Sequence, residues 1–214
     1  REGFIIEFFD VELPENLETM QLPDPSMVNY WRLAENRIFY VDYEIDESIM
    51  ELQRAILSIN IADAGKSVSD RKKIIVMINS PGGLLTETMS VAMSMVTSVT
   101  PVITVNVGAA YSGGALLLLA GHERYAFKYA KTMLHTGSTG GNAGTYEQTE
   151  AYQKMYKKMV DWMGEYILDR STIDQRTFNK NKSKDWYMDN DDCIKYGIIH
   201  SEITSLDDIV KYVK

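Results

Sequence analysis

One serine stands where a strand-like run turns into a helix-like run. Residues 110–114 read Ala-Tyr-Ser-Gly-Gly, with Ser112 in the middle. A turn of this kind exposes the hydroxyl and aims backbone N–H groups at the space beside it, which suits nucleophilic attack on a carbonyl. Serine is also a common helix N-cap, so both catalysis and capping fit this position.

A serine nucleophile needs a general base, and the chain has three histidines. His122 lies in a polar turn and is expected to be exposed. His200 follows an apolar segment at 197–199, where a core strand begins or ends. His135 ends a strand-like run and opens a glycine-rich stretch, where its imidazole can face the same sheet edge as Ser112. A lone histidine is more often structural, and for His135 this placement makes a structural and a catalytic role fit about equally well.

Apolar strand-like runs and amphipathic helix-like runs alternate along the chain. This order predicts parallel strands joined by right-handed crossovers, in a sheet covered on both faces. In such sheets the site lies at the carboxyl ends of the strands, here the glycine-rich turns 79–83 and 108–114. The expected strands are 38–41, 73–78, 102–107 and 132–134, and the expected helices are 45–59, 84–98, 115–120 and 145–170.

The last of these helices is long, about 39 Å at 1.5 Å per residue. Its apolar residues recur at steps of three and one, which places them on a single stripe. A stripe of this kind fits a helix packed on the core, and it fits equally a helix that projects into a partner subunit. The stripe consists of Tyr152, Met155, Tyr156, Met159, Val160, Met163, Tyr166 and Ile167.

The composition is that of one globular domain of 214 residues. A hydrophobic content of 45% with 24% charged residues excludes a disordered chain, and the net charge of −8 argues against a nucleic-acid binder. The single cysteine, Cys193, excludes a disulfide framework and a cysteine zinc site. No apolar stretch approaches the roughly 18 residues of a membrane span. We therefore expect a cytoplasmic protein, with no metal and no organic cofactor.

Most of the negative charge lies near the N-terminus. Residues 1–50 hold 12 acidic residues against three arginines, a net charge of −9. Three of the five prolines lie before residue 28, where no helical period is present. We therefore expect an extended, solvated N-terminal arm over residues 1–28, followed by a single domain over residues 29–214.

Five short motifs stand in a characteristic order. They are Asn-Ser-Pro-Gly-Gly at 79–83, the turn around Ser112, Met-Leu-His at 133–135, Gly-Gly-x-x-Gly at 140–144 and Tyr-Gly-Ile-Ile at 196–199. In this order and spacing the sequence resembles the proteolytic subunit of Clp protease, a ClpP-like serine peptidase. The resemblance extends over about residues 30–214. No single motif is specific, but the five together are.

The resemblance implies a role for each site residue. Ser112 would be the nucleophile and His135 the general base. Asp185, before an aromatic pair, would be the acid that orients the imidazole. Gly83 and Gly113 would donate the two backbone N–H groups of the oxyanion hole. Without the resemblance, the acid could not be chosen over other aspartates, namely Asp174, Asp189, Asp191 and Asp192.

The same resemblance implies a ClpP/crotonase-like fold, an α/β spiral of βαβ units with a parallel sheet and a protruding handle over about residues 136–170. In the family the handle interlocks two heptameric rings into a tetradecamer with the catalytic sites inside. Unfolded polypeptides would be the substrates, an AAA+ unfoldase the partner, and the acidic arm would gather near the axial entrance. The residues that resemble the strand that binds the substrate backbone are Gly140, Gly141, Asn142 and Gly144.

Several positions depart from the family pattern. Tyr111 replaces the usual small residue before the nucleophile, and Thr136 and Gly137 replace a Gln-Pro pair after the histidine. These substitutions alter the expected shape of the substrate cleft and fit a divergent, virus-encoded member. The pocket that docks the unfoldase is aromatic in the family and here holds Ile75, Met77 and Thr97.

Other functions also fit parts of the sequence. An α/β-hydrolase would use Ser112, then Asp189 or Asp192, then His200, but that fold needs further strands where residues 145–182 are expected to be helical. A crotonase-like acyl-CoA enzyme would use paired backbone N–H groups and neither the serine nor the histidine. A non-catalytic ring subunit and a phage head-maturation protease with the same triad are further alternatives.

Overall fold

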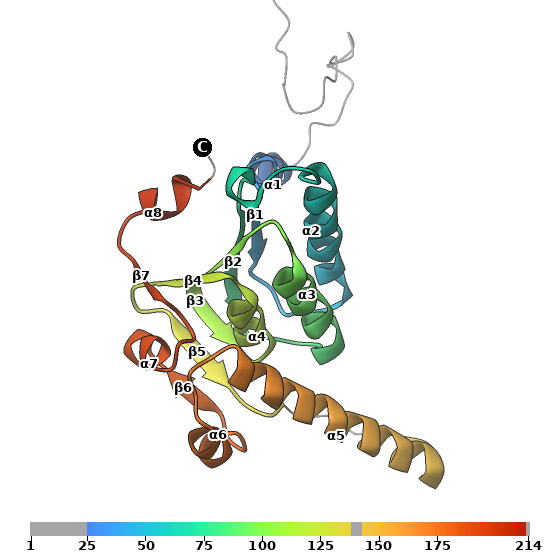
Figure 1. Ribbon diagram of the computed structural model, residues 1–214. Coiled ribbons are helices and arrows are strands. Elements are labelled where there is room, and N and C mark those ends of the chain that lie inside the picture. The colour runs from blue at the N-terminus through green and yellow to red at the C-terminus, as the bar shows by residue number, and fades with distance from the viewer. Residues whose placement is uncertain (1–24, 138–142, 213–214) are drawn as a thin grey trace, which may run out of the picture.

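A computed structural model describes residues 25–137 and 143–212 (Figure 1). A seven-stranded sheet forms its centre, and five strands lie in the order β1-β2-β3-β4-β7 with every neighbouring pair parallel. β5 pairs parallel with β3 and antiparallel with β6. The parallel α/β fold is therefore confirmed. The strands are β1 (Ile38–Val41), β2 (Ile74–Ser80), β3 (Val102–Tyr111), β4 (Glu123–Phe127), β5 (Lys131–Leu134), β6 (Trp186–Met188) and β7 (Ser201–Ile203).

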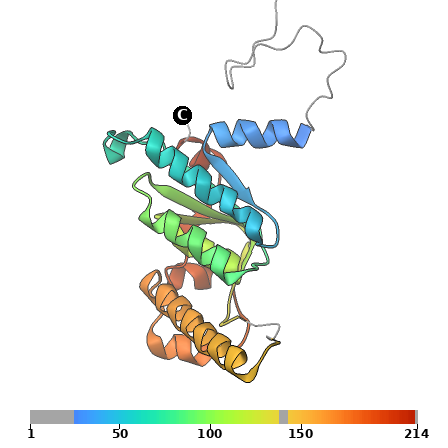
Figure 2. The same cartoon turned by 90° about the vertical axis from the view of Figure 1, so that its right-hand side faces the viewer.

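Helices cover both faces of the sheet unequally. α2 (Met50–Ala62) and α3 (Leu85–Thr97) lie side by side on one face (Figure 2), next to α4 (Gly113–Ala120). The small helix α8 (Asp207–Val210) lies on the other face. The other helices are α1 (Pro25–Glu35), α5 (Tyr146–Asp169), α6 (Gln175–Asn181) and α7 (Asn190–Lys195), with 3-10 turns η2 (Glu47–Ile49) and η3 (Val68–Asp70).

β2 is buried on both faces, as its continuous apolar run predicts. Ile74, Val76 and Ile78 belong to the main core beneath the large helices. The alternate side chains of the strand belong to a second, smaller core on the face that α8 covers. The buried members of this second core are Ile75, Met77, Ile103, Val105, Ile203 and Ile209.

Two strands run further than expected. β2 continues through Ser80 and β3 continues to Tyr111, so the strand ends predicted at residues 78 and 107 are wrong. The register between the two strands shifts beside Asn79, whose side chain accepts a hydrogen bond from the Ala109 N–H at 3.0 Å. This bond bridges the irregularity in the backbone ladder. The extension carries β3 to the point where it pairs with β5.

The helix α1 overlaps the segment predicted to be an extended arm. We expected residues 25–28 to be extended, but the helix begins at Pro25, a residue type that fits the first helical position. Met27, Tyr30 and Trp31 recur at helical spacing, a signal that the expectation of an extended arm overlooked, and all three side chains are exposed. Residues 1–24, which would form most of the arm and its acidic surface, lie outside the described residues.

The long helix α5 is confirmed, and its two halves differ. Thr145 caps it in a reciprocal capping box with Gln148. Near its C-terminus Met163 and Ile167 are buried in the main core, whereas Met155 in the N-terminal half is 48% exposed. This half extends away from the sheet (Figure 1). None of the helices in the described part of the chain is long and apolar enough to cross a membrane.

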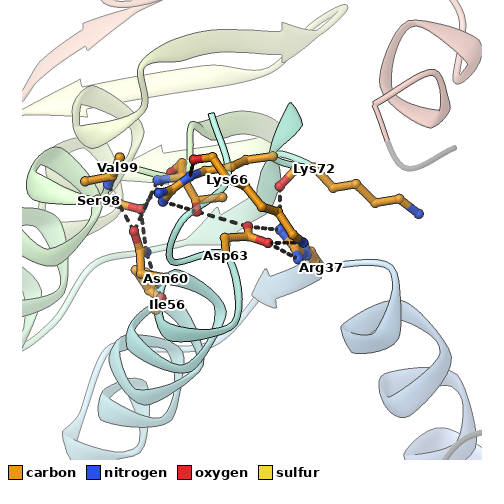
Figure 3. Close-up of polar contacts among 10 residues, drawn as sticks. Arg37, Ile56, Asn60, Asp63, Lys66, Lys72, Ser98 and Val99 are labelled. Carbon is orange, nitrogen blue, oxygen red and sulfur yellow. Dashed lines mark hydrogen bonds and ion pairs between the residues drawn. The ribbon is translucent and has the colours of Figure 1, made fainter. Parts of the chain in front are cut away.

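A buried carboxylate joins the amino ends of three strands (Figure 3). Asp63 follows α2 and is fully buried; its oxygens lie 2.5 and 3.0 Å from the Arg37 guanidinium, 2.8 Å from Lys66 Nζ and 3.1 Å from the Thr100 hydroxyl. Arg37 also donates to the Lys72 carbonyl at 2.7 Å. Arg37 directly precedes β1, and Lys72 and Thr100 lie two residues before β2 and β3. The Asp63 carboxylate and its Arg37 partner therefore tie the starts of these three strands together.

We expect Asp63→Asn to lower the free energy of unfolding by about 3 kcal/mol at pH 7, because it leaves the partly buried Arg37 guanidinium without a charged partner. Hydrogen bonds from Arg37 hold the pKa of the Asp63 carboxyl well below its usual range. The stabilisation is therefore complete above an unfolded-state pKa of about 4 and declines as the pH falls below it.

Urea unfolding of wild type and variant at pH 7 and pH 3 measures both effects, and the difference between the two proteins should shrink at pH 3. Glu51→Gln is the matched control, because it removes an exposed ion pair with Arg54 and should leave the unfolding midpoint nearly unchanged. A loss of the same size at both pH values would contradict the role assigned to the ionised carboxylate.

Candidate active site

Ser112 occupies the turn between β3 and α4 in a strained conformation. Its φ is +52° and its ψ is −118°, which is uncommon for any residue except glycine. It stands at the N-cap of α4, yet its side chain makes no capping bond. The hydroxyl oxygen lies instead 2.7 Å from Nε2 of His135. The capping alternative for this serine is therefore wrong.

The backbone around Ser112 fixes this turn from two sides. The Ser112 N–H donates to the Met133 carbonyl of β5 at 2.9 Å, and the Ser112 carbonyl accepts from the Ala115 N–H of α4 at 3.0 Å. The neighbouring turn approaches so closely that a Cβ on Gly82 would lie 2.7 Å from the Ser112 Cβ. Only glycine at position 82, with its φ of +96°, permits this approach.

His135 lies between Ser112 and Asp185. Its Nδ1 is 3.3 Å from Oδ1 of Asp185, on the opposite side of the ring from the serine. Antiparallel pairing of β5 with β6 explains this proximity: Met133 pairs with Tyr187, and the next pair is Leu134 with Trp186. One step further along the same register, residue 135 stands opposite residue 185. The Asp185 side chain is 57% exposed.

The two glycines expected to form an oxyanion hole both face the same space. Gly83 forms a parallel bridge with Ile45, in which the Ile45 N–H donates to Gly82 and the Ile45 carbonyl accepts from Leu84. Since the flanking groups make these bonds, the N–H of Gly83 points away from Ile45. Gly113 is the first residue of α4, where an N–H has no acceptor within the helix.

These residues line a cavity of about 790 Å³. Ser112, Gly113, Gly83 and His135 form one end of it. The wall contributed by α5 is rich in methionine and tyrosine, whereas acidic side chains approach from the segment before η2 and from the first turn of α3. The α5 residues are Tyr152, Met155, Tyr156, Met159 and Met163, and the acidic residues are Glu44, Asp46 and Glu87.

The other two histidines lie at the opposite end of the sheet, where β4 and β7 begin. The ring Nδ1 of His122 accepts from the Val102 N–H at 3.1 Å, and the ring Nδ1 of His200 accepts from the Arg124 N–H at 3.2 Å. Partial burial of the ring lowers the pKa of each imidazole, with a further decrease from nearby arginine charge. His122 is exposed, as predicted. The hydrolase alternative fails because His200 is not at the serine's end of the sheet.

Two further aspartates that the sequence left open are helix caps. Asp174 accepts from the Thr177 N–H at the start of α6, and Asp189 accepts from the Asp192 N–H at the start of α7. Their carboxylates therefore serve the helices that follow them. Among the described residues, no group of three His, Cys, Asp or Glu side chains is placed to hold a metal ion.

The expected substrate-binding strand falls largely outside the described residues. Gly140, Gly141 and Asn142 lie outside them, so their role stays a prediction. Gly144 is described, and it stands in an exposed bend before Thr145 instead of in a strand. A Cβ at Gly144 would lie 2.7 Å from Gln148 Oε1, so this glycine accommodates the capping box of α5. Its contact with substrate likewise stays a prediction.

The family model of Clp protease matches residues 25–205. The chain belongs to the Clp protease family. The family comprises peptidases that work as oligomeric assemblies, and the parallel sheet and its helices agree with the Clp protease fold. The matched range includes all of α1.

In this Clp protease we expect Gly83→Ala to abolish the Ile45–Gly83 bridge, because the added Cβ would lie 2.1 Å from the Ile45 carbonyl oxygen. Peptidase activity should fall at least about 100-fold, because the backbone N–H of residue 83, the expected oxyanion donor, would no longer be held in place. Gly65→Ala is the matched control, since its φ of +86° is also left-handed but nothing lies within 4 Å. Equal activity in the two variants would show that the contact between Gly83 and Ile45 is not needed for activity.

Proposed function

We propose that this protein is a serine endopeptidase, the proteolytic subunit of a self-compartmentalised Clp-type protease. The observation that carries the proposal is the 2.7 Å contact between Ser112 Oγ and His135 Nε2, with Asp185 on the far side of the same imidazole. This order of hydroxyl, imidazole and carboxylate is the one that activates a serine for acyl transfer.

In the proposed first step, Ser112 Oγ attacks the carbonyl carbon of a peptide bond while His135 Nε2 takes the hydroxyl proton. Asp185 faces Nδ1 and stabilises the imidazolium that forms. The carbonyl oxygen becomes an oxyanion, which the N–H groups of Gly83 and Gly113 would stabilise. His135 then gives its proton to the leaving amine, the C–N bond breaks, and an acyl-enzyme ester remains on Ser112.

In the second step, water attacks the acyl-enzyme ester. His135 takes a proton from the water, and the oxygen attaches to the acyl carbon through the same oxyanion geometry. Collapse of this second tetrahedral intermediate releases the carboxylate product and returns the proton to Ser112. The reaction consumes one water molecule for each peptide bond and needs no metal or organic cofactor.

Unfolded polypeptides are the proposed substrates. The methionine side chains of the α5 wall are unbranched and polarisable, so they adapt to many apolar side chains. No lysine or arginine lies among the described residues that line the cavity, and the acidic residues at its edge favour neutral or basic segments. These features support the proposal that the site binds the main chain of the substrate and cleaves peptides of varied sequence.

Stacked heptameric rings are the proposed assembly, with the face of α5 that carries Met155 and Trp162 between subunits. Trp162 and Met155 are 53% and 48% exposed on this helix, which supports a further contact surface there. An AAA+ unfoldase is the proposed partner. The expected docking residues Ile75 and Met77 are buried in the second core, while Thr97 is exposed at the end of α3. This surface differs from the aromatic pocket expected of the family.

We expect a fluorophosphonate probe to add once to the wild-type protein and not to Ser112→Ala, as read by intact mass. His135→Ala should slow labelling at least about 100-fold, because the hydroxyl then lacks its base. His122→Ala is the matched control and should label within about twofold of wild type, because this imidazole lies at the other end of the sheet. An assembled wild-type particle without an adduct would contradict the proposal. Acyl-CoA turnover unaffected by Ser112→Ala would favour the crotonase-like alternative.

We expect native mass spectrometry to find a particle fourteen times the mass of the 24.3 kDa chain. Trp162→Glu should shift the population to smaller species, because it buries a charge in the proposed contact surface. Gln153→Glu adds the same charge to an exposed polar position on the same helix and should leave the particle intact. A wild-type protein that remains monomeric at micromolar concentration would contradict the ring assembly.

A further inference from the structure

Two tyrosine rings link the strand that leads to Ser112 with the strand that follows Asp185. Tyr111 is the last residue of β3, and its ring meets that of Tyr187 in β6 edge to face, with centroids 5.6 Å apart and planes at 87°. Aromatic pairs prefer this arrangement. Ser112 directly follows the first ring, and Asp185 precedes the second by two residues.

The contact between the rings crosses a complete strand. Tyr111 pairs with Met133 of β5, and Met133 pairs with Tyr187. The three residues therefore form one row across β3, β5 and β6. Side chains two residues apart along a strand point to the same side, so Asp185 leaves the chain on the same side as the Tyr187 ring. The row of the two rings lies two positions along the ladder from His135 and Asp185, with the Leu134–Trp186 pair between the two rows.

The position of Asp185 depends on β6, the strand that follows it, because few contacts hold the carboxylate itself. Its contact with Nδ1 of His135 is its only hydrogen bond or ion pair with another described residue. The side chain is 57% exposed. β6 itself has three residues and, among the strands that the structure describes, pairs with β5 alone. A short edge strand with one ladder slips or frays more readily than a central strand.

We propose that Tyr111 and Tyr187 are positioning residues that hold β6, and with it Asp185, against His135. This proposal rests on the Ser112, His135 and Asp185 mechanism given above. A small residue at position 111, as expected from the family pattern, could not reach the ring across β5. The pair therefore supplies, in this chain, a contact between the nucleophile-bearing and acid-bearing strands that the backbone ladder lacks.

A double-mutant cycle tests the proposal on the full chain. Rates of Ser112-dependent fluorophosphonate labelling are measured for Tyr187→Ala in the wild-type background and in the Asp185→Asn background. We expect a three- to tenfold loss in the first, about the worth of one aromatic pair, and less than about 1.5-fold in the second. The neutral amide of Asp185→Asn cannot stabilise the His135 imidazolium, so the position of this side chain then has little effect on the labelling rate. Tyr187→Phe should restore the rate, and with a peptide substrate the loss should fall on kcat and not on KM.

Tyr40→Ala is the matched control, because it removes a half-exposed strand tyrosine far from the site and should leave labelling unchanged. If Tyr187→Ala does not melt cooperatively, Tyr187→Leu replaces it, since leucine keeps the apolar bulk without the ring edge. Equal losses in both backgrounds, or no loss in the wild-type background, would overturn the positioning role while leaving the serine mechanism intact. Absence of Ser112-dependent labelling in the wild type would overturn both proposals.

Discussion

The register of β5 against its two neighbours is the constraint on which the candidate site depends. β5 pairs in parallel with the end of β3 and antiparallel with β6, so it brings segments more than 70 residues apart in sequence to one sheet edge. A shift of one residue in either ladder would turn His135 to the other face of the sheet. The arrangement of Ser112, His135 and Asp185 is thus a property of strand pairing before it is a property of the side chains.

The two ends of the sheet are built differently. At the amino ends, the buried Asp63 carboxylate collects arginine, lysine and threonine partners with every contact satisfied. At the carboxyl ends, Ser112 holds a strained backbone conformation, and Gly82 and Gly83 allow contacts that no Cβ would permit. Strain persists at a site only where the surrounding structure determines it fully. The hydrogen-bonded network around Asp63 fixes the amino ends of β1, β2 and β3, and β3 carries that order to the strained turn at Ser112.

Much of this fold can be predicted from sequence because the signals are local. Nearby residues alone are enough to recognise the apolar run of β2, the stripe of α5 and the glycine-rich turn around Ser112. Asp185 cannot be chosen that way, since its partner lies 50 positions away and only the β5–β6 register joins them. Likewise the continuation of β2 depends on a side-chain bond from Asn79 that no propensity reveals. α1 is missed for another reason: the three prolines before residue 28 suggest an extended arm, although Met27, Tyr30 and Trp31 recur at helical spacing.

The division of α5 into two halves has a consequence for how an active particle arises. Its C-terminal turns are ordered by the subunit's own core, whereas residues 150–155 are exposed, and isolated helical turns are marginal in water. Yet Tyr152 and Met155 from that exposed part line the cavity next to Ser112. In the proposed assembly, the contacts that join the subunits also order the exposed turns of α5. Association of the subunits therefore completes the wall of the substrate cavity. Dilution would then weaken the wall as well as the particle, and proteolytic capacity would be low in newly made, unassembled chains.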